Sequence, residues 1–218
     1  TDHAADLLFA PSEEAATNLR DEGLADGVHV SGDVGYDALL WARERADKSV
    51  LGDVSVEDRA FVLATVHREA NADDPDRLES IVDALAADPR RVVFPAHPRT
   101  TDRLREFGLY ERATRELTVV DPVGYRQFVA LLDAADVVAT DSGGVQKEAF
   151  FLDTPCVTLR EETEWVETVE SGWNTLVGAD EGRIRDALAD ATSPAEKPAP
   201  YGDGHAARRI VEVLEDVV

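Results

Sequence analysis

The sequence predicts an α/β protein built on a parallel β-sheet. Apolar runs of strand length alternate with segments whose apolar residues recur every three or four positions, as on one face of a helix. The short runs are rich in valine and lack strict alternation of apolar and polar residues, which is typical of strands buried on both faces. Strands and helices that alternate in this way form a parallel sheet with crossover connections.

The predicted elements follow one another along the whole chain. Strands are expected at residues 7–10, 28–31, 61–66, 92–96, 117–120, 137–140, 156–159 and 175–177. Helices are expected at 34–46, 75–87, 125–134 and 145–152, and a last helix at 205–217 follows a loop rich in Pro and Gly at 192–204. The polar stretch 46–58 interrupts the alternation and marks a boundary.

Composition and charge exclude several classes of protein. The 218 residues are 44% hydrophobic, enough for a substantial core. The 22 basic and 45 acidic residues give a net charge of −23, which would repel a nucleic-acid backbone, so we expect no nucleic-acid partner. The lysines are confined to Lys48, Lys147 and Lys197, and this scarcity beside the acidic excess suggests an acidic, halophile-like protein whose self-repulsion is screened by salt.

The sequence also bears on compartment and redox chemistry. No run of 18 or more apolar residues and no signal peptide is present, so we expect no membrane partner and a cytoplasmic location. Cys156 stands alone, which fits a buried apolar residue better than a disulfide or metal site. The chain begins at Thr1 and contains no Met, and we expect it to be part of a longer protein.

Polar and charged side chains follow four of the predicted strands. They are His67, Arg68 and Glu69 after the third strand, His97 and Arg99 after the fourth, Ser142, Gly143 and Gly144 after the sixth, and Arg160 and Glu164 after the seventh. Ligands of doubly wound sheets bind outside the carboxyl ends of the strands. The sequence therefore predicts a binding site at this edge of the sheet.

The stretch Ser142-Gly143-Gly144 has the features of a phosphate cradle. Amides at the start of a helix attract anions, glycine lets a phosphate oxygen approach the backbone, and serine adds a hydroxyl donor. Glu148 follows one helical turn later and could accept the hydroxyls of a ribose. A plain N-cap with a tight turn is the alternative reading of these letters. The stretch is neither G-x-G-x-x-G nor a P-loop.

The other candidates are cationic or aromatic. His67 could be a core histidine, but with Arg68 beside it at a strand end a diphosphate contact is the better reading. His97 and Arg99 are weaker candidates. Phe128 could be a core residue or could flank a base. His67 and His97 stand on separate loops without an acidic ligand set at zinc spacing, so no metal site is predicted.

Seven segments in order carry a resemblance to a known family: "FAPSEEAATNLRDEG", "VSGDVGYDALLW", "TVHREAN", "HPRT", "TDSGGVQKEA", "TPCVTLREETEWVETVESGWNTLVG" and "YGDGHAARRI". Together they resemble the C-terminal portion of the non-hydrolysing UDP-N-acetylglucosamine 2-epimerases. The resemblance implies a Rossmann-like parallel-sheet domain of a two-domain fold of the GT-B type. Residues 1–25 would end the first domain, 26–200 would form the UDP-binding second domain, and 201–218 would be a helix that packs back on the first.

The resemblance also implies roles for individual residues. His67 would be catalytic and contact the diphosphate, Ser142, Gly143 and Gly144 would bind phosphate, Glu148 would bind ribose and Phe128 would lie near uracil. Arg68 would also contact UDP, and His97, Arg99, Arg160 and Glu164 are further candidates. No cofactor is implied, the partner is a UDP-sugar, and the full-length protein would be a homodimer. The carboxylates that move the C2 proton would lie upstream of Thr1.

The sequence departs from the family pattern at three places. Bacterial members read His-Arg-Arg-Glu where this chain has His67 to Ala70, so a second arginine is missing. Trp165 stands where those members have an arginine, which removes one candidate phosphate contact, and Val123 stands where they have a glutamine.

The implied reaction inverts C2 of UDP-N-acetylglucosamine (UDP-GlcNAc) to give the manno epimer (UDP-ManNAc), by elimination and re-addition of UDP, as in cell-surface polysaccharide biosynthesis. Three alternatives stay open from the sequence: a GT-B glycosyltransferase, a cousin that acts on a more modified UDP-sugar such as a diacetamido uronic acid, and a non-catalytic UDP-sugar-binding protein.

Overall fold

The computed structural model describes residues 2–57 and 59–217, and the chain folds into two compact units. The first unit comprises residues 1–44 and 196–218, and the second comprises residues 45–195. The boundaries expected after residues 25 and 200 assign segments to the two domains of the family fold and stay a prediction.

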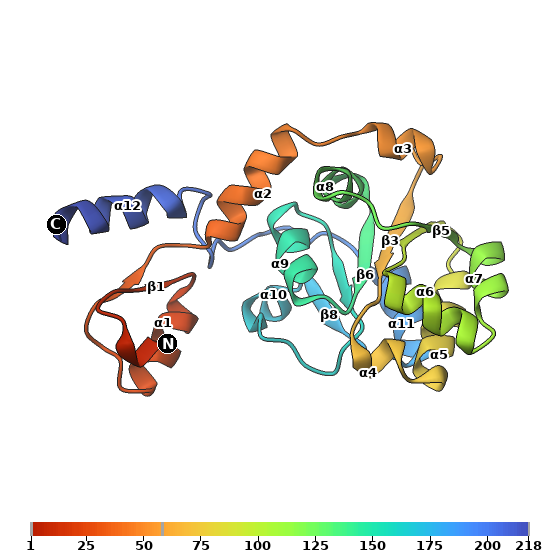
Figure 1. The fold of residues 1–218 in the computed structure, drawn as a ribbon, viewed down its shortest axis with the longest axis horizontal. Coiled ribbons are helices and arrows are strands. Elements are labelled where there is room, and N and C mark those ends of the chain that lie inside the picture. Colours follow the sequence, from red (N-terminus) through yellow and green to blue (C-terminus); the bar gives the residue numbers. More distant parts are fainter. Residues whose placement is uncertain (1, 58, 218) are drawn as a thin grey trace. The chain divides into compact units, whose positions relative to one another are not determined.

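The first unit holds a small parallel sheet and three longer helices (Figure 1). Its elements are η1 (Asp2–Ala4), β1 (Leu8–Ala10), α1 (Glu13–Asp21), β2 (Val28–Val30), α2 (Val34–Glu44) and α12 (Ala206–Val217). Strand β1 pairs in parallel with β2. The Asp37 carboxylate of α2 accepts hydrogen bonds from the amides of Ala206 and Ala207, and so ties the start of α12 to α2.

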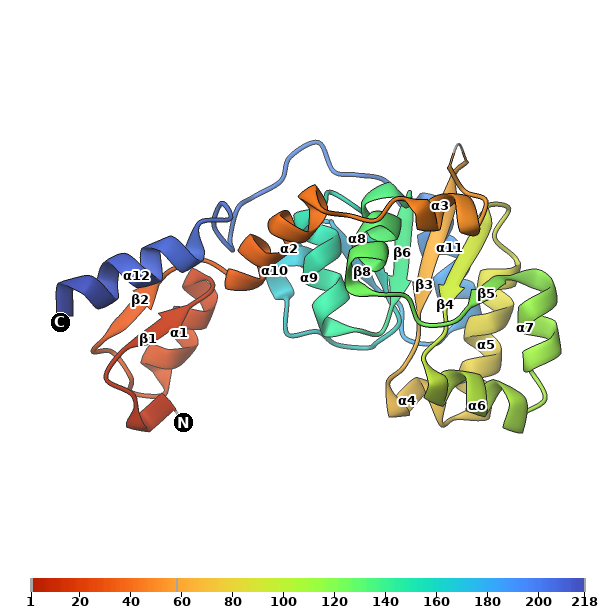
Figure 2. The same cartoon turned by 45° about the horizontal axis from the view of Figure 1, so that its top comes forward.

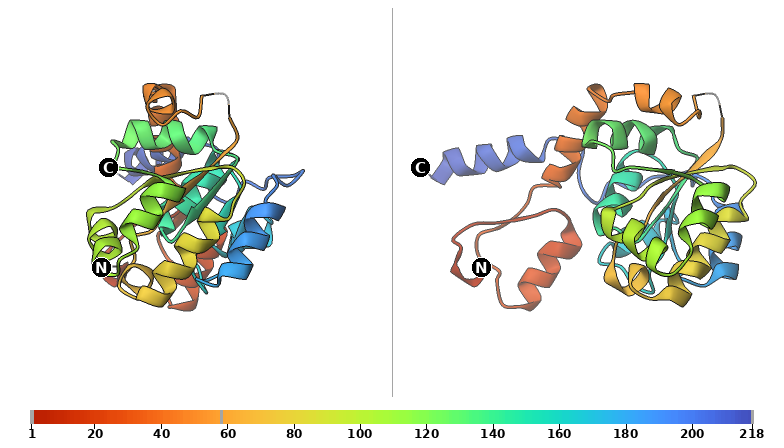
Figure 3. Two further views of the ribbon diagram at one scale, coloured as in Figure 1. Left: turned by 90° about the vertical axis from the view of Figure 1, so that its right-hand side faces the viewer. Right: turned by 45° about the vertical axis from the view of Figure 1, so that its right-hand side comes forward.

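The second unit is a six-stranded parallel sheet with helices on both faces. In chain order its elements are α3 (Ser49–Asp53), β3 (Phe61–Thr65), α4 (Glu69–Ala72), α5 (Pro75–Ala86), β4 (Arg91–Pro95), α6 (Pro98–Glu106), α7 (Tyr110–Glu116), β5 (Thr118–Val120), α8 (Tyr125–Ala134), β6 (Val137–Thr140), α9 (Gly143–Phe151), β7 (Cys156–Thr158), α10 (Val166–Glu170), β8 (Asn174–Leu176) and α11 (Glu181–Asp190). Helices α8 and α9 lie over one face, and α5 and α11 over the other (Figures 2 and 3).

The strand order β5-β4-β3-β6-β7-β8 is that of a doubly wound fold. The chain starts in the middle of the sheet at β3, proceeds outward to β5, and then returns to pair β6 with β3 before it proceeds to the other edge. The point between β3 and β6 is therefore the topological switch point, where such folds leave a crevice at the carboxyl ends of the strands. The predicted parallel α/β class is confirmed.

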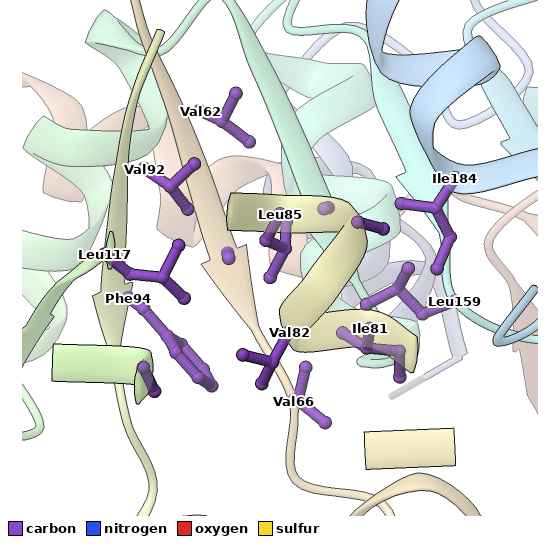
Figure 4. Packing of buried hydrophobic residues seen from close by; sticks show 14 of the residues in the cluster. Val62, Val66, Ile81, Val82, Leu85, Val92, Phe94, Leu117, Leu159 and Ile184 are labelled. Atoms are coloured by element: carbon purple, nitrogen blue, oxygen red, sulfur yellow. The ribbon is translucent and has the colours of Figure 1, made fainter. Parts of the chain in front are cut away.

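The core shows why the valine-rich runs become strands. Val62 and Val66 of the β3 segment are buried on one face of the sheet, where Ile81, Val82 and Leu85 of α5 belong to the same apolar cluster (Figure 4). Burying a side chain of this size contributes about 1.5–3 kcal/mol. Because both faces of the sheet are covered, alternation of apolar and polar residues is not needed.

Every predicted strand is present with ends within one residue of those expected. The predicted helices are also present, with two corrections. The helix expected at 34–46 ends at Glu44, and the helix expected at 145–152 begins at Gly143, because Ser142 already serves as its N-cap. The polar break at 46–58 contains the short helix α3, and its residue 58 lies outside the described residues.

Two further findings concern the expectations about chemistry and location. Cys156 is buried in β7, so the interpretation as a small buried residue in a strand is confirmed. Burial raises the pKa of its thiol to about 12. Among the helices of residues 2–57 and 59–217, none is long and apolar enough to cross a bilayer.

Candidate functional site

The switch point places two of the predicted loops side by side. Strands β3 and β6 pair in register from Val62 and Val137 to Thr65 and Thr140. The hydroxyls of Thr65 and Thr140 lie 2.6 Å apart and link the two strand ends. The loop that begins at His67 and the one that begins at Asp141 therefore leave the sheet together, although 74 positions separate these two residues in the sequence.

His67 is held by a buried carboxylate. Its Nδ1 lies 3.0 Å from Oδ1 of Asp141, whose side chain is fully buried. Asp141 also accepts hydrogen bonds from the backbone amides of His67 and Arg68 and from Nδ2 of Asn71. The imidazole itself is 41% exposed, so one edge of the ring is anchored while the ring stays accessible.

The start of α9 carries unpaired amides. Ser142 is the N-cap, and its hydroxyl accepts a hydrogen bond from the amide of Val145. The Ser142 amide is itself occupied, because it donates to Oγ1 of Thr140. The amides of Gly143 and Gly144, at the first two helical positions, donate to no other described residue, as expected at a helix N-terminus. These two amides form the free part of the cradle.

Three side chains from other elements lie close to Gly143. A Cβ at this position would lie 3.4 Å from Nε1 of Trp165, 3.7 Å from Oε2 of Glu164 and 3.8 Å from Nη2 of Arg68. Trp165 donates from Nε1 to the carbonyl of Gly143 at 2.8 Å, and the Lys147 ammonium lies 4.0 Å from the centre of its ring. Trp165 thus packs on the first turn of α9, and the Arg68 guanidinium lies beside the cradle.

Glu148 is paired with a tyrosine. The Tyr125 hydroxyl at the start of α8 donates a hydrogen bond of 2.8 Å to Oε1 of Glu148. Burial raises the pKa of Glu148, although the Tyr125 hydrogen bond opposes this. Burial and the neighbouring Glu148 charge raise the pKa of Tyr125, which therefore stays a protonated donor.

A cavity of about 390 Å³ joins these groups. Its polar lining includes His67, Ser142, Glu148 and Tyr125, and its apolar wall is formed by Pro95, Pro122, Val123, Phe128 and Val145. His97, Thr65 and Val66 complete the lining. The rings of His67 and His97 meet edge to face, with centroids 6.2 Å apart. A cavity with one apolar wall and a few polar groups beside a helix N-terminus has the character of a nucleotide site.

The remaining candidates lie at the margin or outside this cavity. Arg99 is engaged by Asp73 and Glu69, and Arg103 shares Asp73. The hydrogen bonds from Arg99 and then Arg103 lower the pKa of Asp73 to about 2. Arg99 does not belong to the described residues that line the cavity. Its part in binding stays a prediction, while its ion pairs join α6 to both ends of α4.

Arg160 and Glu164 form a two-pronged ion pair near the cradle. Nη1 and Nη2 of Arg160 lie 2.9 and 3.0 Å from the two carboxylate oxygens of Glu164. The hydrogen bond from Arg160 lowers the pKa of Glu164 to about 2. Glu164 is therefore a charged neighbour of Gly143, and Arg160 is held beside it.

Two residues of this site are not among those predicted from the sequence. Tyr125 ends the stretch "DPVGY" and lies three residues before Phe128. A tyrosine at the start of a helix, one turn before a candidate base-binding aromatic residue, could have indicated a further site residue. Asp141 directly follows a predicted strand, the same signal that marked Ser142, but nothing in the neighbouring residues indicates its partner. Only the pairing of β3 with β6 shows that its carboxylate meets His67.

The acidic and histidine side chains form no metal site in the part of the chain that the structure describes. In residues 2–57 and 59–217, no group of three His, Cys, Asp or Glu side chains is placed to hold a metal ion.

Comparison with known proteins agrees with this geometry. The chain is 42% identical over its whole length to a UDP-N-acetylglucosamine 2-epimerase homolog of Methanococcus maripaludis, and spans 62% of that protein. It is 44% identical over 98% of its length to a UDP-2,3-diacetamido-2,3-dideoxy-D-glucuronate 2-epimerase of Pseudomonas aeruginosa, and spans 61% of it. The chain thus covers less than two thirds of the length of these relatives.

Solved structures show the same relationship. The crystal structure of Methanocaldococcus jannaschii UDP-GlcNAc 2-epimerase in complex with UDP-GlcNAc and UDP superposes with a TM-score of 0.85 at 36% identity, over 99% of this chain and 62% of that one. This agreement extends the confirmed fold class to the GT-B type of these epimerases. A family model described as UDP-N-acetylglucosamine 2-epimerase matches residues 1–215. The chain therefore belongs to the UDP-N-acetylglucosamine 2-epimerase family.

Proposed function

We propose that this chain is the UDP-binding part of an enzyme that interconverts UDP-GlcNAc and UDP-ManNAc. The observation that carries the proposal is the arrangement at one cavity: His67 on a strand end, Ser142 at the N-cap of α9 and Glu148 one turn on line it. The free amides of Gly143 and Gly144 open the same helix directly after Ser142. This arrangement suits a diphosphate joined to a ribose. The family membership and the UDP-containing structure of the M. jannaschii relative support the same ligand.

The binding roles follow from the chemistry of each group. The amides of Gly143 and Gly144 and the hydroxyl of Ser142 would donate to phosphate oxygens, with Arg68 supplying a nearby positive charge. Glu148 would accept from the ribose hydroxyls. Phe128, Val123 and Pro122 form the apolar wall on which a pyrimidine base would lie. His97, which also lines the cavity, would contact the base or the diphosphate.

The reaction requires a proton transfer and a leaving group. A base removes the proton at C2 while the C1–O bond to UDP breaks, which gives an unsaturated sugar. Reprotonation of C2 from the other face and re-addition of UDP to C1 then yield the epimer, with no net redox change. This chain would stabilise the departing diphosphate through His67 and the cradle. The base would be a carboxylate of the rest of the full-length protein, and the reaction needs no metal or organic cofactor.

The sugar specificity is less constrained than the nucleotide. One relative is named for a diacetamido glucuronate sugar, and the described cavity residues suit a nucleotide rather than a particular sugar. A 2-epimerase for such a modified UDP-sugar is therefore the second candidate. Parallel assays of the two UDP-sugars with the full-length protein distinguish them.

The experiment that tests the proposal is hydrogen exchange at C2. UDP-GlcNAc is incubated with full-length protein in heavy water and analysed by NMR and mass spectrometry, without an acceptor. We expect deuterium at C2 and formation of UDP-ManNAc. Transfer of the sugar only when an acceptor is added would instead indicate a glycosyltransferase, and binding without exchange would indicate a UDP-sugar-binding protein.

The wider setting is also a proposal. A homodimeric cytoplasmic enzyme that supplies an activated sugar for cell-surface polysaccharides fits the family. The excess of acidic residues, with a net charge of −23, supports a saline habitat and argues against a nucleic-acid or membrane partner.

A further inference from the structure

Asp141 is a fully buried acidic residue beside the cavity, and it accepts hydrogen bonds from its neighbours. Three N–H donors reach its carboxylate, the amides of His67 and Arg68 and Nδ2 of Asn71, and Nδ1 of His67 lies 3.0 Å from Oδ1. The first three can only donate, and they reach both carboxylate oxygens. An ionised carboxylate, which only accepts, satisfies all of them.

The orientation of the supporting amide is fixed independently. Oδ1 of Asn71 accepts from Nε and Nη2 of Arg77 at 3.1 and 3.0 Å, so the other end of the amide must be Nδ2. That Nδ2 donates to Asp141 and to the carbonyl of Leu159. The series of hydrogen bonds from Arg77 through Asn71 to Asp141 therefore means that the Asp141 carboxylate can only accept a hydrogen bond from His67.

We propose that Asp141 is a positioning residue that keeps a proton on Nδ1 of His67, so that Nε2 is the atom that exchanges protons at the cavity. A neutral imidazole bonded through Nδ1–H to a carboxylate has a bare Nε2. When a diphosphate binds, Nε2 takes up a proton from the solvent and donates a charged hydrogen bond to a phosphate oxygen, with the carboxylate of Asp141 balancing the new positive charge. The tautomer part is independent of the ligand, whereas the phosphate part depends on the proposed function.

The alternative tautomer would have a different consequence. With the proton on Nε2 and a bare Nδ1, the ring would meet the carboxylate lone pairs at 3.0 Å and would have nothing to donate. In Asp141→Asn this conflict disappears. The amide oxygen can keep the bonds from Arg68 and Asn71, and the new NH₂ faces Nδ1, so Nδ1 becomes the acceptor and Nε2 carries the proton.

The test reads the two ring nitrogens directly. The 218-residue chain labelled with ¹⁵N at histidine is examined by NMR, with His67→Gln used to assign the signals. We expect Nδ1 of His67 to carry a proton in the unliganded wild type, and Nε2 to carry it in Asp141→Asn. The matched control is Asp136→Asn, because Asp136 also accepts from a β3 amide, that of Phe61 at 2.7 Å, at the opposite end of the same strand pair. The control should leave the His67 tautomer unchanged.

UDP affinity supplies a second readout. Asp141→Asn replaces a charged hydrogen bond to phosphate with a neutral one, so we expect the Kd for UDP to rise about tenfold. In a His67→Ala background the same substitution should change the Kd little, because the effect acts through the imidazole. An equal loss in both backgrounds would mean that Asp141 only maintains the loop, and would overturn the proposal.

The possible failures can be told apart. A bare Nδ1 in the wild type overturns the positioning role even if Asp141→Asn does not fold. If Nδ1 carries the proton as expected but the wild type binds no UDP, the positioning role of Asp141 stands and the proposed function fails instead.

Discussion

The Tyr125 hydroxyl donates a hydrogen bond of 2.8 Å to Oε1 of Glu148, and so joins the start of α8 to the second turn of α9 beside the cavity. Oε2 of Glu148 accepts no hydrogen bond from the described residues. One carboxylate oxygen is thus held by the protein while the other is free for a ligand. This arrangement makes Glu148 the most informative position for mutation.

Removal of the Glu148 carboxylate should weaken nucleotide binding and leave the fold intact. We expect Glu148→Ala to cost about 1–3 kcal/mol in UDP binding, the usual loss for a hydrogen bond to a charged group. Calorimetry measures the change, and circular dichroism checks the helix, which accommodates Ala well. Glu170→Ala, an exposed carboxylate on α10 outside the cavity lining, is the control. An unchanged UDP affinity in Glu148→Ala would show that Glu148 does not contact the nucleotide.

The amide variant separates binding from stability. Burial raises the pKa of Glu148 above 4.5, so the folded state binds more protons than the unfolded state in the window above 4.5, and stability falls as pH rises through it. Glu148→Gln removes the charge and keeps an acceptor for Tyr125. We expect a higher Tm at neutral pH, no gain below pH 4.5, and weaker UDP binding. A Tm that falls at neutral pH would contradict the burial cost.

Arg99 should matter more for stability than for ligand binding. Its bond to Asp73, together with that of Arg103, lowers the pKa of that carboxyl from 3.8 to about 2, so the associated stability is present above pH 3.8 and is lost as pH falls to about 2. Arg99→Gln should lower the Tm at neutral pH and leave UDP affinity unchanged. Arg105→Gln, on the exposed side of the same helix, is the control. Weaker UDP binding by Arg99→Gln would show that Arg99 reaches the diphosphate.

The chain should recognise the nucleotide rather than the sugar. The described cavity offers a carboxylate and an apolar wall, which suit ribose and base, and the free amides at the start of α9 beside it suit a diphosphate. We expect calorimetry to detect binding of UDP and no binding of free GlcNAc. Sugar binding in the absence of UDP would mean that the polar groups of the cavity recognise the sugar rather than the nucleotide.

Salt should stabilise the fold. A net charge of −23 produces self-repulsion that weakens as the Debye length falls from about 10 Å at 0.1 M salt to about 3 Å at 1 M. We therefore expect the Tm to rise between low and molar KCl. A melting temperature that is insensitive to salt would argue against adaptation to a saline habitat.

The elements of the fold were largely determined by the sequence. Valine-rich runs such as 61–66 and 137–140 became the buried strands β3 and β6, because both faces of the sheet are covered. The Ser-Gly-Gly stretch became the start of a helix, because serine caps the helix and the bare glycines leave their amides open. Local chemistry decides these features, so they can be read from neighbouring residues.

The partners of the site residues were decided by tertiary structure. The order of strands placed β6 beside β3, and only that pairing brought Asp141 to His67 and left Ser142 facing the same cavity. Packing of α8 beside α9 gave Glu148 its Tyr125 partner, and the approach of α6 to α4 committed Arg99 to Asp73. These contacts join residues that lie 23 to 74 positions apart. No local propensity encodes them, because each depends on how the chain crosses the sheet.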